Sequence, residues 1–255
     1  MTIIKYSDGS EVDLVFDEKA HKYRVGEDVV LSVTKIIDNI VPVYLTDWAA
    51  KSGADWWMSN YHRCIENEPD MVGEYNTYIY DGIRNAHKNV SQTALDIGKN
   101  VHKYIESAIR WSMESYSEGY VGEMPEMPEN EAAVNSIKAF GEWVKENDVE
   151  WISTEERIYS KKYNYAGTVD AVAKIDNKLS VIDFKTSKKI YKNYKLQIYA
   201  YKQAIEEIYG ERVESCWILR FDKTTGKFQA LKAKDDYLPA FLKGLDFLNE
   251  YKRRR

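Results

Sequence analysis

The sequence predicts an α+β fold, a small mixed sheet flanked by helices with a helical region ahead of it. Residues 32–147 carry apolar side chains mostly at helical spacing. Residues 151–231 instead contain short apolar or alternating runs bounded by turn-forming residues, and helical segments follow them. Strands followed by helices are typical of the α+β class. A composition of 44% hydrophobic and 30% charged residues is ordinary for a folded globular chain.

Composition excludes several classes of protein. The mean hydropathy is −0.56 and no apolar run approaches the length of a bilayer span, which excludes a transmembrane protein. Cys64 and Cys216 are the two cysteines, too few for a disulfide framework, a four-cysteine zinc site or a four-thiolate iron–sulfur cluster. The first residues lack the basic and then apolar segment of an export signal, so we expect a cytoplasmic protein.

The N-terminal region begins with a predicted hairpin and a short helix. Residues 12–16 and 21–25 alternate in polarity across a polar turn, a pattern that favours two antiparallel strands. A helix is predicted through residues 36–40, with Ser32 or Thr34 as its cap.

Two longer helices are predicted next. The first begins with Ser91 as its cap and carries apolar residues near the helical period. Residues 119–128 contain two glycines and two prolines and form the clearest loop of the chain. The second helix covers about residues 130–147.

The second half is predicted to contain most of the sheet. Its elements, in order, are strands at 151–159, 165–175 and 179–184, a turn at 176–178, a helix at about 193–209, strands at 216–221 and 227–231, and a closing helix at 235–251.

Charge is distributed unevenly along the chain, whose net charge is −5. Residues 114–150 carry ten acidic side chains against two lysines, and a solvated face is the simple interpretation of this run. Residues 157–202 carry eleven basic side chains against three aspartates. Two of those aspartates, Asp170 and Asp183, lie in apolar strands and are expected to be buried. We infer a surface that binds polyanions around them.

Two aspartates and a lysine are predicted to meet at one edge of the sheet. Asp170 lies in one predicted strand and Asp183 in the next, after a hairpin turn. Because side chains alternate along a strand, Asp183 and Lys185 share a face and Phe184 points to the other. Two carboxylates in an apolar setting repel each other, and a divalent cation such as Mg²⁺ or Mn²⁺ relieves that cost. The alternative is a strand-edge ion pair that involves Lys185 and no metal ion.

Other polar residues are candidates by position. Gln197 and Tyr201 share a face of a predicted helix, an arrangement that is also typical of packing or surface residues. His102 lies on a helix of the other half, where a packed or solvated histidine is the simpler interpretation. Glu155 and Glu156 lie in the strand before Asp170's, and one of them is expected to face the same pocket.

Together these residues form an ordered pattern along most of the chain. Its elements are Gly98-x-x-x-His102, Glu155, Gly167-x-x-Asp170, Asp183-Phe184-Lys185 and Gln197-x-x-x-Tyr201. This order resembles the RecB-type branch of the PD-(D/E)xK nuclease superfamily. The resemblance extends to residues 31–37, 45–48, 164–170 and 179–187, and within the branch it is closest to the mitochondrial genome maintenance exonucleases and their phage-encoded relatives.

The resemblance implies a restriction-endonuclease-like core and a metal-dependent site. Asp170 and Asp183 would hold a catalytic Mg²⁺ or Mn²⁺, His102 would complete its shell, and the Phe184 carbonyl would contribute a further ligand. These donors suit such hard cations, which polarise a phosphoryl oxygen and activate water.

The same resemblance implies roles for the remaining motif residues. Lys185 would orient the attacking water or stabilise the charge that develops on the phosphate, and the sequence does not decide between these roles. Glu155 would bind a second metal ion or position other ligands. Gln197 and Tyr201 would brace Lys185 or contact DNA.

A basic segment with interleaved tyrosines follows Lys185 and suits a surface that tracks a nucleic acid backbone. The DNA-binding candidates in it are Lys188, Lys189, Lys192, Tyr194 and Lys195. Aromatic stacking tolerates any base, so single strands or frayed ends are the expected substrate. The tryptophans of the N-terminal half either pack in a core or form part of an arch over this channel; they are Trp48, Trp56, Trp57 and Trp111.

The resemblance therefore implies a metal-dependent DNA exonuclease that prefers single strands or free ends and serves recombination, replication or repair, in the host cytosol if phage-encoded. Residues 1–148 would form a hairpin and helical region and residues 149–255 the nuclease core. A recombinase or a single-strand-binding protein is a conceivable partner, and no membrane is expected. The alternatives are an exonuclease of double-strand ends, a structure-specific endonuclease, or a noncatalytic DNA-binding protein on a nuclease fold.

Overall fold

The chain divides into two compact units in the computed structural model. The first unit comprises residues 1–41 and 100–255, and the second comprises residues 42–99. His102 therefore belongs to the same unit as the predicted catalytic strands. The structure describes residues 1–41, 46–65, 72–115, 123–222 and 224–254.

The first unit begins with an antiparallel meander of four strands. They are β1 (Thr2–Lys5), β2 (Glu11–Asp17), β3 (Lys22–Val25) and β4 (Asp28–Ser32). The predicted hairpin is confirmed as β2 and β3, and β1 and β4 extend it on either side. β1 and β4 were not predicted, because each is short and gains its partners only within the folded sheet.

Five further strands complete a mixed sheet. They are β5 (Val149–Ser160), β6 (Tyr165–Ile175), β7 (Lys178–Lys185), β8 (Ser215–Phe221) and β9 (Phe228–Lys232). The strand order is β1-β2-β3-β4-β6-β7-β8-β9, and β5 pairs with β6. The β4–β6 and β7–β8 pairs are parallel and the others antiparallel, so the predicted mixed sheet is confirmed. Asp176 and Asn177, both with positive φ, form the tight β6–β7 turn.

The helices are α1 (Val33–Ile40), α2 (Thr46–Ile65), α3 (Val72–Glu114), α4 (Glu131–Glu146), α5 (Lys192–Tyr209) and α6 (Leu238–Arg253). The Ser32 side chain accepts a hydrogen bond from the Lys35 amide at 3.1 Å, which confirms Ser32 as the cap of α1. The predicted cap at Ser91 is wrong, because α3 begins at Val72 and passes through it. No proline interrupts this stretch, and an interior serine costs a helix only tenths of a kcal/mol.

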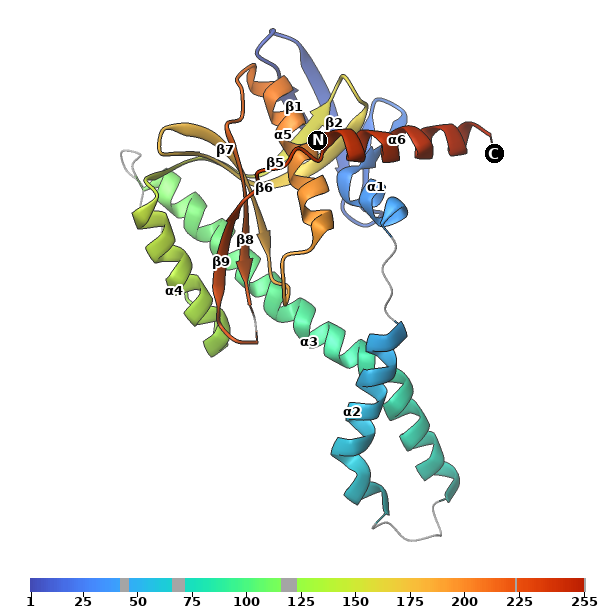
Figure 1. Ribbon diagram of the computed structural model, residues 1–255. Helices are drawn as coiled ribbons and strands as arrows, with labels where there is room; N and C mark the ends of the chain where they lie inside the picture. The colour runs from blue at the N-terminus through green and yellow to red at the C-terminus, as the bar shows by residue number, and fades with distance from the viewer. Residues whose placement is uncertain (42–45, 66–71, 116–122, 223, 255) are drawn as a thin grey trace. The chain divides into compact units, whose positions relative to one another are not determined.

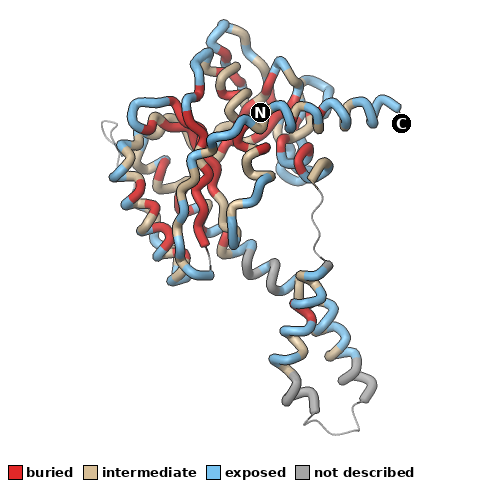
Figure 2. The backbone as a smooth tube through the Cα atoms, viewed as in Figure 1, coloured by how far each residue is buried: buried red, intermediate tan, exposed pale blue. Residues whose placement is uncertain are grey.

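Helices α5 and α4 cover opposite faces of the sheet (Figure 1). Val181 of β7 and Ile218 of β8 join the apolar cluster on which α5 packs. Phe184 of β7 and Phe221 of β8 lie 6.0 and 5.5 Å from the ring of Phe140 on α4. Since side chains alternate along each strand, the two sets point to opposite faces. The strands between these layers are among the most buried parts of the unit (Figure 2).

The second unit contains α2 and the first part of α3. The rings of Trp56 and Tyr78 lie 5.6 Å apart, and those of Trp48 and His87 lie 6.1 Å apart. A Cβ atom at Gly82 would lie 2.0 Å from the Trp56 ring, so the helices approach closely only because this residue is glycine. These contacts favour packing within the unit for Trp48 and Trp56, and the arch stays a prediction.

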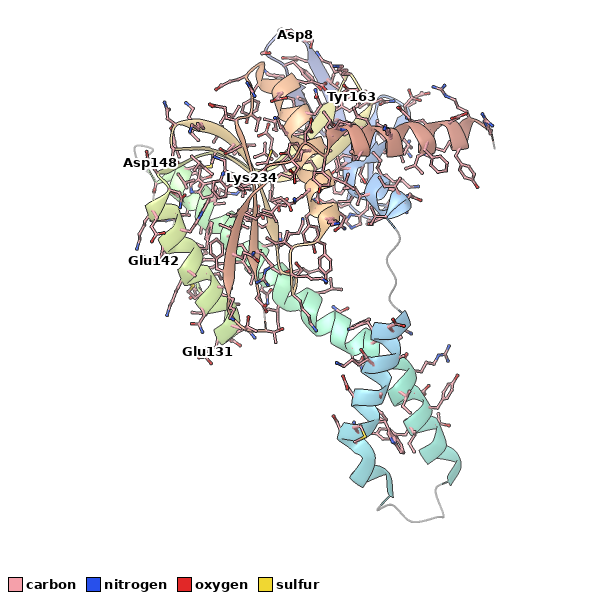
Figure 3. The ribbon with its side chains drawn as sticks, viewed as in Figure 1. Asp8, Glu131, Glu142, Asp148, Tyr163 and Lys234 are labelled. Carbon is pink, nitrogen blue, oxygen red and sulfur yellow. The ribbon has the colours of Figure 1, made fainter. Side chains whose placement is uncertain are left out.

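The acidic run lies partly on α4. Glu131 and Glu142 are exposed on this helix, and Asp148 follows its end (Figure 3). Glu142 pairs with Lys145 at 2.9 Å. The positions of these side chains support a solvated face. Within the described ranges, no helix combines the length and the apolar character needed to cross a membrane.

Candidate active site

The predicted acidic residues form a row across three neighbouring strands. In the β5–β6 register the pairs Thr154–Ala171 and Glu156–Val169 flank Glu155 and Asp170, and Asp183 directly follows the last β6–β7 pair. The β6–β7 ladder ends at the pair of Ala171 and Ile182, directly before this row. The row therefore lies where the two central strands of the site cease to pair.

Where β6 and β7 stop pairing, the Asp170 carboxylate accepts a backbone hydrogen bond from β7. Its Oδ2 accepts a hydrogen bond from the Phe184 amide at 2.6 Å. Its own carbonyl accepts one from the Thr154 hydroxyl at 3.0 Å. Burial raises the pKa of Asp170, while the Lys185 charge and the Phe184 amide oppose that rise. The Asp170 side chain is thus held beside the end of β7 by its hydrogen bond to the Phe184 amide, beyond the last backbone pair of the β6–β7 ladder.

Asp183 and Lys185 lie in direct contact on the face that α5 covers. The Lys185 Nζ lies 2.7 Å from each carboxylate oxygen of Asp183 and makes a hydrogen bond to Oδ1. Asp183 is completely buried, and its Oδ2 has no hydrogen-bond partner. Burial raises the pKa of Asp183, and the Lys185 charge opposes this rise. The charge of this oxygen is offset by the Lys185 ammonium at 2.7 Å, and its unused hydrogen-bonding capacity makes it a candidate ligand position.

Lys185 is enclosed by anions and an aromatic ring. Its side chain is 17% exposed, and Nζ lies 5.0 Å from the ring centroid of Tyr194 on α5. Burial alone lowers the pKa of Lys185, but the charges of Asp183 and Asp170 outweigh it and raise the pKa above its ordinary value. In this arrangement the side chain keeps its positive charge at neutral pH.

His102 approaches the site from the other face of β7. Its ring lies 6.2 Å from that of Phe184, which points away from Asp183. Burial lowers the pKa of His102, and the Lys185 charge lowers it further, against the charges of Asp183 and Glu106. A neutral imidazole is therefore favoured, the form that binds metal ions.

The donors present suit a hard divalent cation in their chemistry. Two carboxylates, an imidazole and a backbone carbonyl are suitable ligands, and Asp183 Oδ2 is buried without a hydrogen bond. However, no three His, Cys, Asp or Glu side chains in the described part of the chain lie close enough together to hold a metal ion. The Lys185 ammonium instead balances the Asp183 charge. The predicted shell of His102, Asp170, Asp183 and Phe184 is thus brought together only in part.

The two neighbouring glutamates have different surroundings. Glu156 accepts a hydrogen bond from the Tyr209 hydroxyl at 2.8 Å and another from the Ser153 hydroxyl. Glu155 is exposed, with a φ of 50° at its place in the acidic row. Partial desolvation and the nearby Asp170 charge raise the pKa of Glu155. Glu155 is therefore the glutamate that interacts electrostatically with Asp170, and Glu156 belongs to a hydrogen-bond network with Tyr209 and Ser153.

Gln197 and Tyr201 on α5 form a hydrogen-bonded pair, of which Tyr201 is buried. The Gln197 amide donates to the Tyr201 hydroxyl at 2.9 Å, and Tyr201 is only 3% exposed. Burial raises the pKa of Tyr201, and the Asp183 and Asp170 charges add to this rise. The Tyr201 ring packs on Gly167, at the start of the strand that carries Asp170.

Replacing Gly167 with alanine is expected to destabilise the protein by about 2 kcal/mol, because overpacking a buried contact forces neighbours to move. The new Cβ would lie 2.8 Å from the Tyr201 ring. Gly141→Ala is the matched control, since a Cβ at Gly141 in α4 meets nothing within 4 Å. That change should stabilise the helix by about 0.5–1 kcal/mol. Urea unfolding measures both, and an unchanged Gly167→Ala variant would contradict the close contact.

The predicted DNA-binding lysines lie around the start of α5. Lys188, Lys189 and Lys192 are exposed. Lys195 is partly buried and pairs with Asp235 at 3.3 Å, so its charge is already balanced. The Tyr191 and Tyr194 rings meet edge to face at 5.5 Å.

One polar residue beside the site was missed from the sequence. Arg220 lies on β8 next to Lys185 in the parallel register and is 7% exposed. Its charge within the otherwise apolar run from Cys216 to Phe221 was a usable signal, because a buried arginine needs partners. Two of those partners, Asp222 and Gln229, are close in sequence, and the carbonyls of Ser187 and Lys188 are distant in sequence.

Comparison with known proteins finds solved structures that are similar to this chain. No protein-family model matches the chain. No curated protein matches its sequence. The chain is similar to a candidate exonuclease from Eubacterium rectale, with 15% identity and a TM-score of 0.40, and the match covers 59% of this chain and 64% of that one, less than two thirds of its length.

It is also similar to the alkaline exonuclease LHK-Exo from Laribacter hongkongensis, with 15% identity and a TM-score of 0.31 over 60% of this chain and 82% of that one. A structure of LHK-Exo in complex with dAMP is similar at 16% identity and a TM-score of 0.32, over 60% and 83% of the two chains. At these identities the likeness concerns the fold, and function is inferred from the side chains of the site.

Proposed function

We propose that this protein is a metal-dependent DNA exonuclease of the RecB-type PD-(D/E)xK branch that prefers single strands or free DNA ends. One observation carries the proposal: completely buried Asp183 has an oxygen without a hydrogen bond, beside Asp170 and Lys185. Such crowding of charge costs folding free energy and is typical of catalytic sites. The ordered sequence pattern supports the same activity.

Asp170, Asp183, His102 and the Phe184 carbonyl would hold Mg²⁺ or Mn²⁺. The bound cation supplies positive charge against the phosphate and lowers the pKa of water. Asp170 is oriented by the Phe184 amide at 2.6 Å. Lys185 then places a fixed positive charge where negative charge grows on the phosphate, and Glu155 adds a further carboxylate at the rim.

The substrate preference rests on the surface after β7. Lys188, Lys189 and Lys192 are exposed there and supply charge for a phosphate backbone. Tyr191, which is 42% exposed, offers a ring on which a base can stack. Neither feature reads a base edge, so cleavage without sequence specificity is expected. Tyr201 is buried, which favours its bracing role over contact with DNA.

A noncatalytic DNA-binding protein is the second candidate. It is favoured by the absence, in the described residues, of three metal-binding side chains close enough to hold an ion. It would use the exposed lysines without cutting.

The test compares end-labelled single strands, linear duplexes and closed circles with Mg²⁺, Mn²⁺ or EDTA. Metal-dependent shortening of single strands from an end is the expected result. Preference for linear duplexes would identify a double-strand-end exonuclease, and cutting of circles an endonuclease. Salt-sensitive binding with no cleavage under either metal would overturn the nuclease proposal and favour the second candidate.

A further inference from the structure

Arg220 links the predicted catalytic strand to the chain segment that follows it. Its Nη1 donates hydrogen bonds to the carbonyls of Ser187 and Lys188, at 3.0 and 3.1 Å. These residues belong to the anchor segment, residues 186–191, which connects Lys185 to α5. Two backbone carbonyls of this connection are thus fixed by one buried guanidinium on the neighbouring strand.

The guanidinium has two further hydrogen-bond acceptors. Asp222 Oδ2 accepts from Nη1 at 3.0 Å, and Gln229 on β9 accepts from Nε at 3.2 Å. Asp222 also caps the β8–β9 turn, because its Oδ1 accepts the amides of Thr224 and Thr225 at 3.0 Å each. Arg220 therefore ties the anchor segment to Asp222 at the end of β8.

The anchor segment carries exposed charge. Lys188 and Lys189 are exposed within it, and the Lys189 ammonium lies over the Tyr191 ring at 5.2 Å. The Ser187 hydroxyl bonds the Lys189 carbonyl at 2.8 Å, so the segment turns tightly on itself. Its fold determines where both ammonium groups can reach, and Arg220 bonds the carbonyl of Lys188 directly.

We propose that Arg220 is a positioning residue for nucleic acid binding, which holds the anchor segment so that Lys188 and Lys189 reach neighbouring phosphates of a single strand. The inference rests on the proposed function, since it names the surface that binds the substrate. Arg220 offers Nη1 to two carbonyls and a carboxylate and Nε to the Gln229 side-chain oxygen, whereas a lysine has a single nitrogen and cannot make both sets of contacts.

Binding of a short fluorescent single-stranded oligonucleotide, measured in EDTA, tests this role without requiring cleavage. Arg220→Lys keeps the charge and loses the fork. We expect about tenfold weaker binding and a shallower dependence on salt, comparable to the loss of one or two phosphate contacts. On a Lys188→Ala/Lys189→Ala background the same change should have no further effect, because residues that act through one another are not additive.

Lys161→Met is the matched control, since it breaks an ion pair with Asp8 in the same unit. It should leave binding within about twofold, as expected of a pair outside the binding surface. Asp222→Asn removes the negative charge that accepts from Arg220 Nη1 and should also weaken binding.

Unchanged binding by Arg220→Lys, or an equal loss on both backgrounds, would overturn the proposal. So would unfolding of both the Arg220 and Asp222 variants by circular dichroism, because the pair would then serve stability alone. Cleavage by the unmodified protein with Mg²⁺ or Mn²⁺ is scored separately. Its absence would refute the nuclease activity while the binding result still decides the role of Arg220.

Discussion

Replacing Asp183 with asparagine is expected to lower DNA cleavage by about 10³-fold or more, because the change removes a charged ligand and alters the charge beside the phosphate. The fold should persist. The change also leaves the buried Lys185 ammonium without its closest counter-charge, so the free energy of unfolding should fall by about 3 kcal/mol. Single-turnover cleavage and urea unfolding of the same preparation measure the two effects.

The matched control for this change is Asp176→Asn. It removes the same charge from the exposed turn that joins the same two strands. Cleavage by this control should remain within about twofold of the unmodified protein, as is usual for surface substitutions. An Asp183→Asn variant that retained a large share of the activity would show that the buried carboxylate is structural, and that the strand-edge ion pair is the correct interpretation.

Replacing Lys185 with methionine is expected to reduce cleavage by about 10²–10³-fold, the usual cost of losing a positioned charge in an active site. The same change should strengthen binding of Mn²⁺ by about tenfold, which corresponds to about 1.4 kcal/mol. The reason is competition, since the Lys185 ammonium lies 2.7 Å from each oxygen of Asp183 and neutralises the carboxylate that a cation would use. Calorimetric titration with Mn²⁺ measures this affinity.

Lys178→Met serves as the control for the lysine change, because Lys178 is exposed at the other end of the same strand. It should alter neither cleavage nor Mn²⁺ affinity by more than about twofold. Weaker binding of Mn²⁺ by the Lys185 variant would contradict this prediction. It would show that the ammonium assists binding of the cation rather than competing with it.

Local patterns predicted much of the fold. The strand at residues 165–175 was predicted with the bounds that the structure has, and the turn after it was predicted one residue too long. Alternation also placed Asp183 and Lys185 on one face, and their contact follows from a two-residue spacing within one strand. Such features depend on neighbours in sequence, so the chain specifies them without knowledge of its tertiary partners.

Residues distant in sequence decided the rest. The start of α3 at Val72 and the parallel pairing of β7 with β8 are not encoded in any local period. That pairing alone brings Arg220 beside Lys185, and the parting of β6 from β7 frees the Phe184 amide for the Asp170 carboxylate. The sequence by itself determined which charged residues share a strand and a face. Only the tertiary structure decided their partners, because hydrogen bonds between strands form wherever the folded sheet leaves a backbone group unpaired.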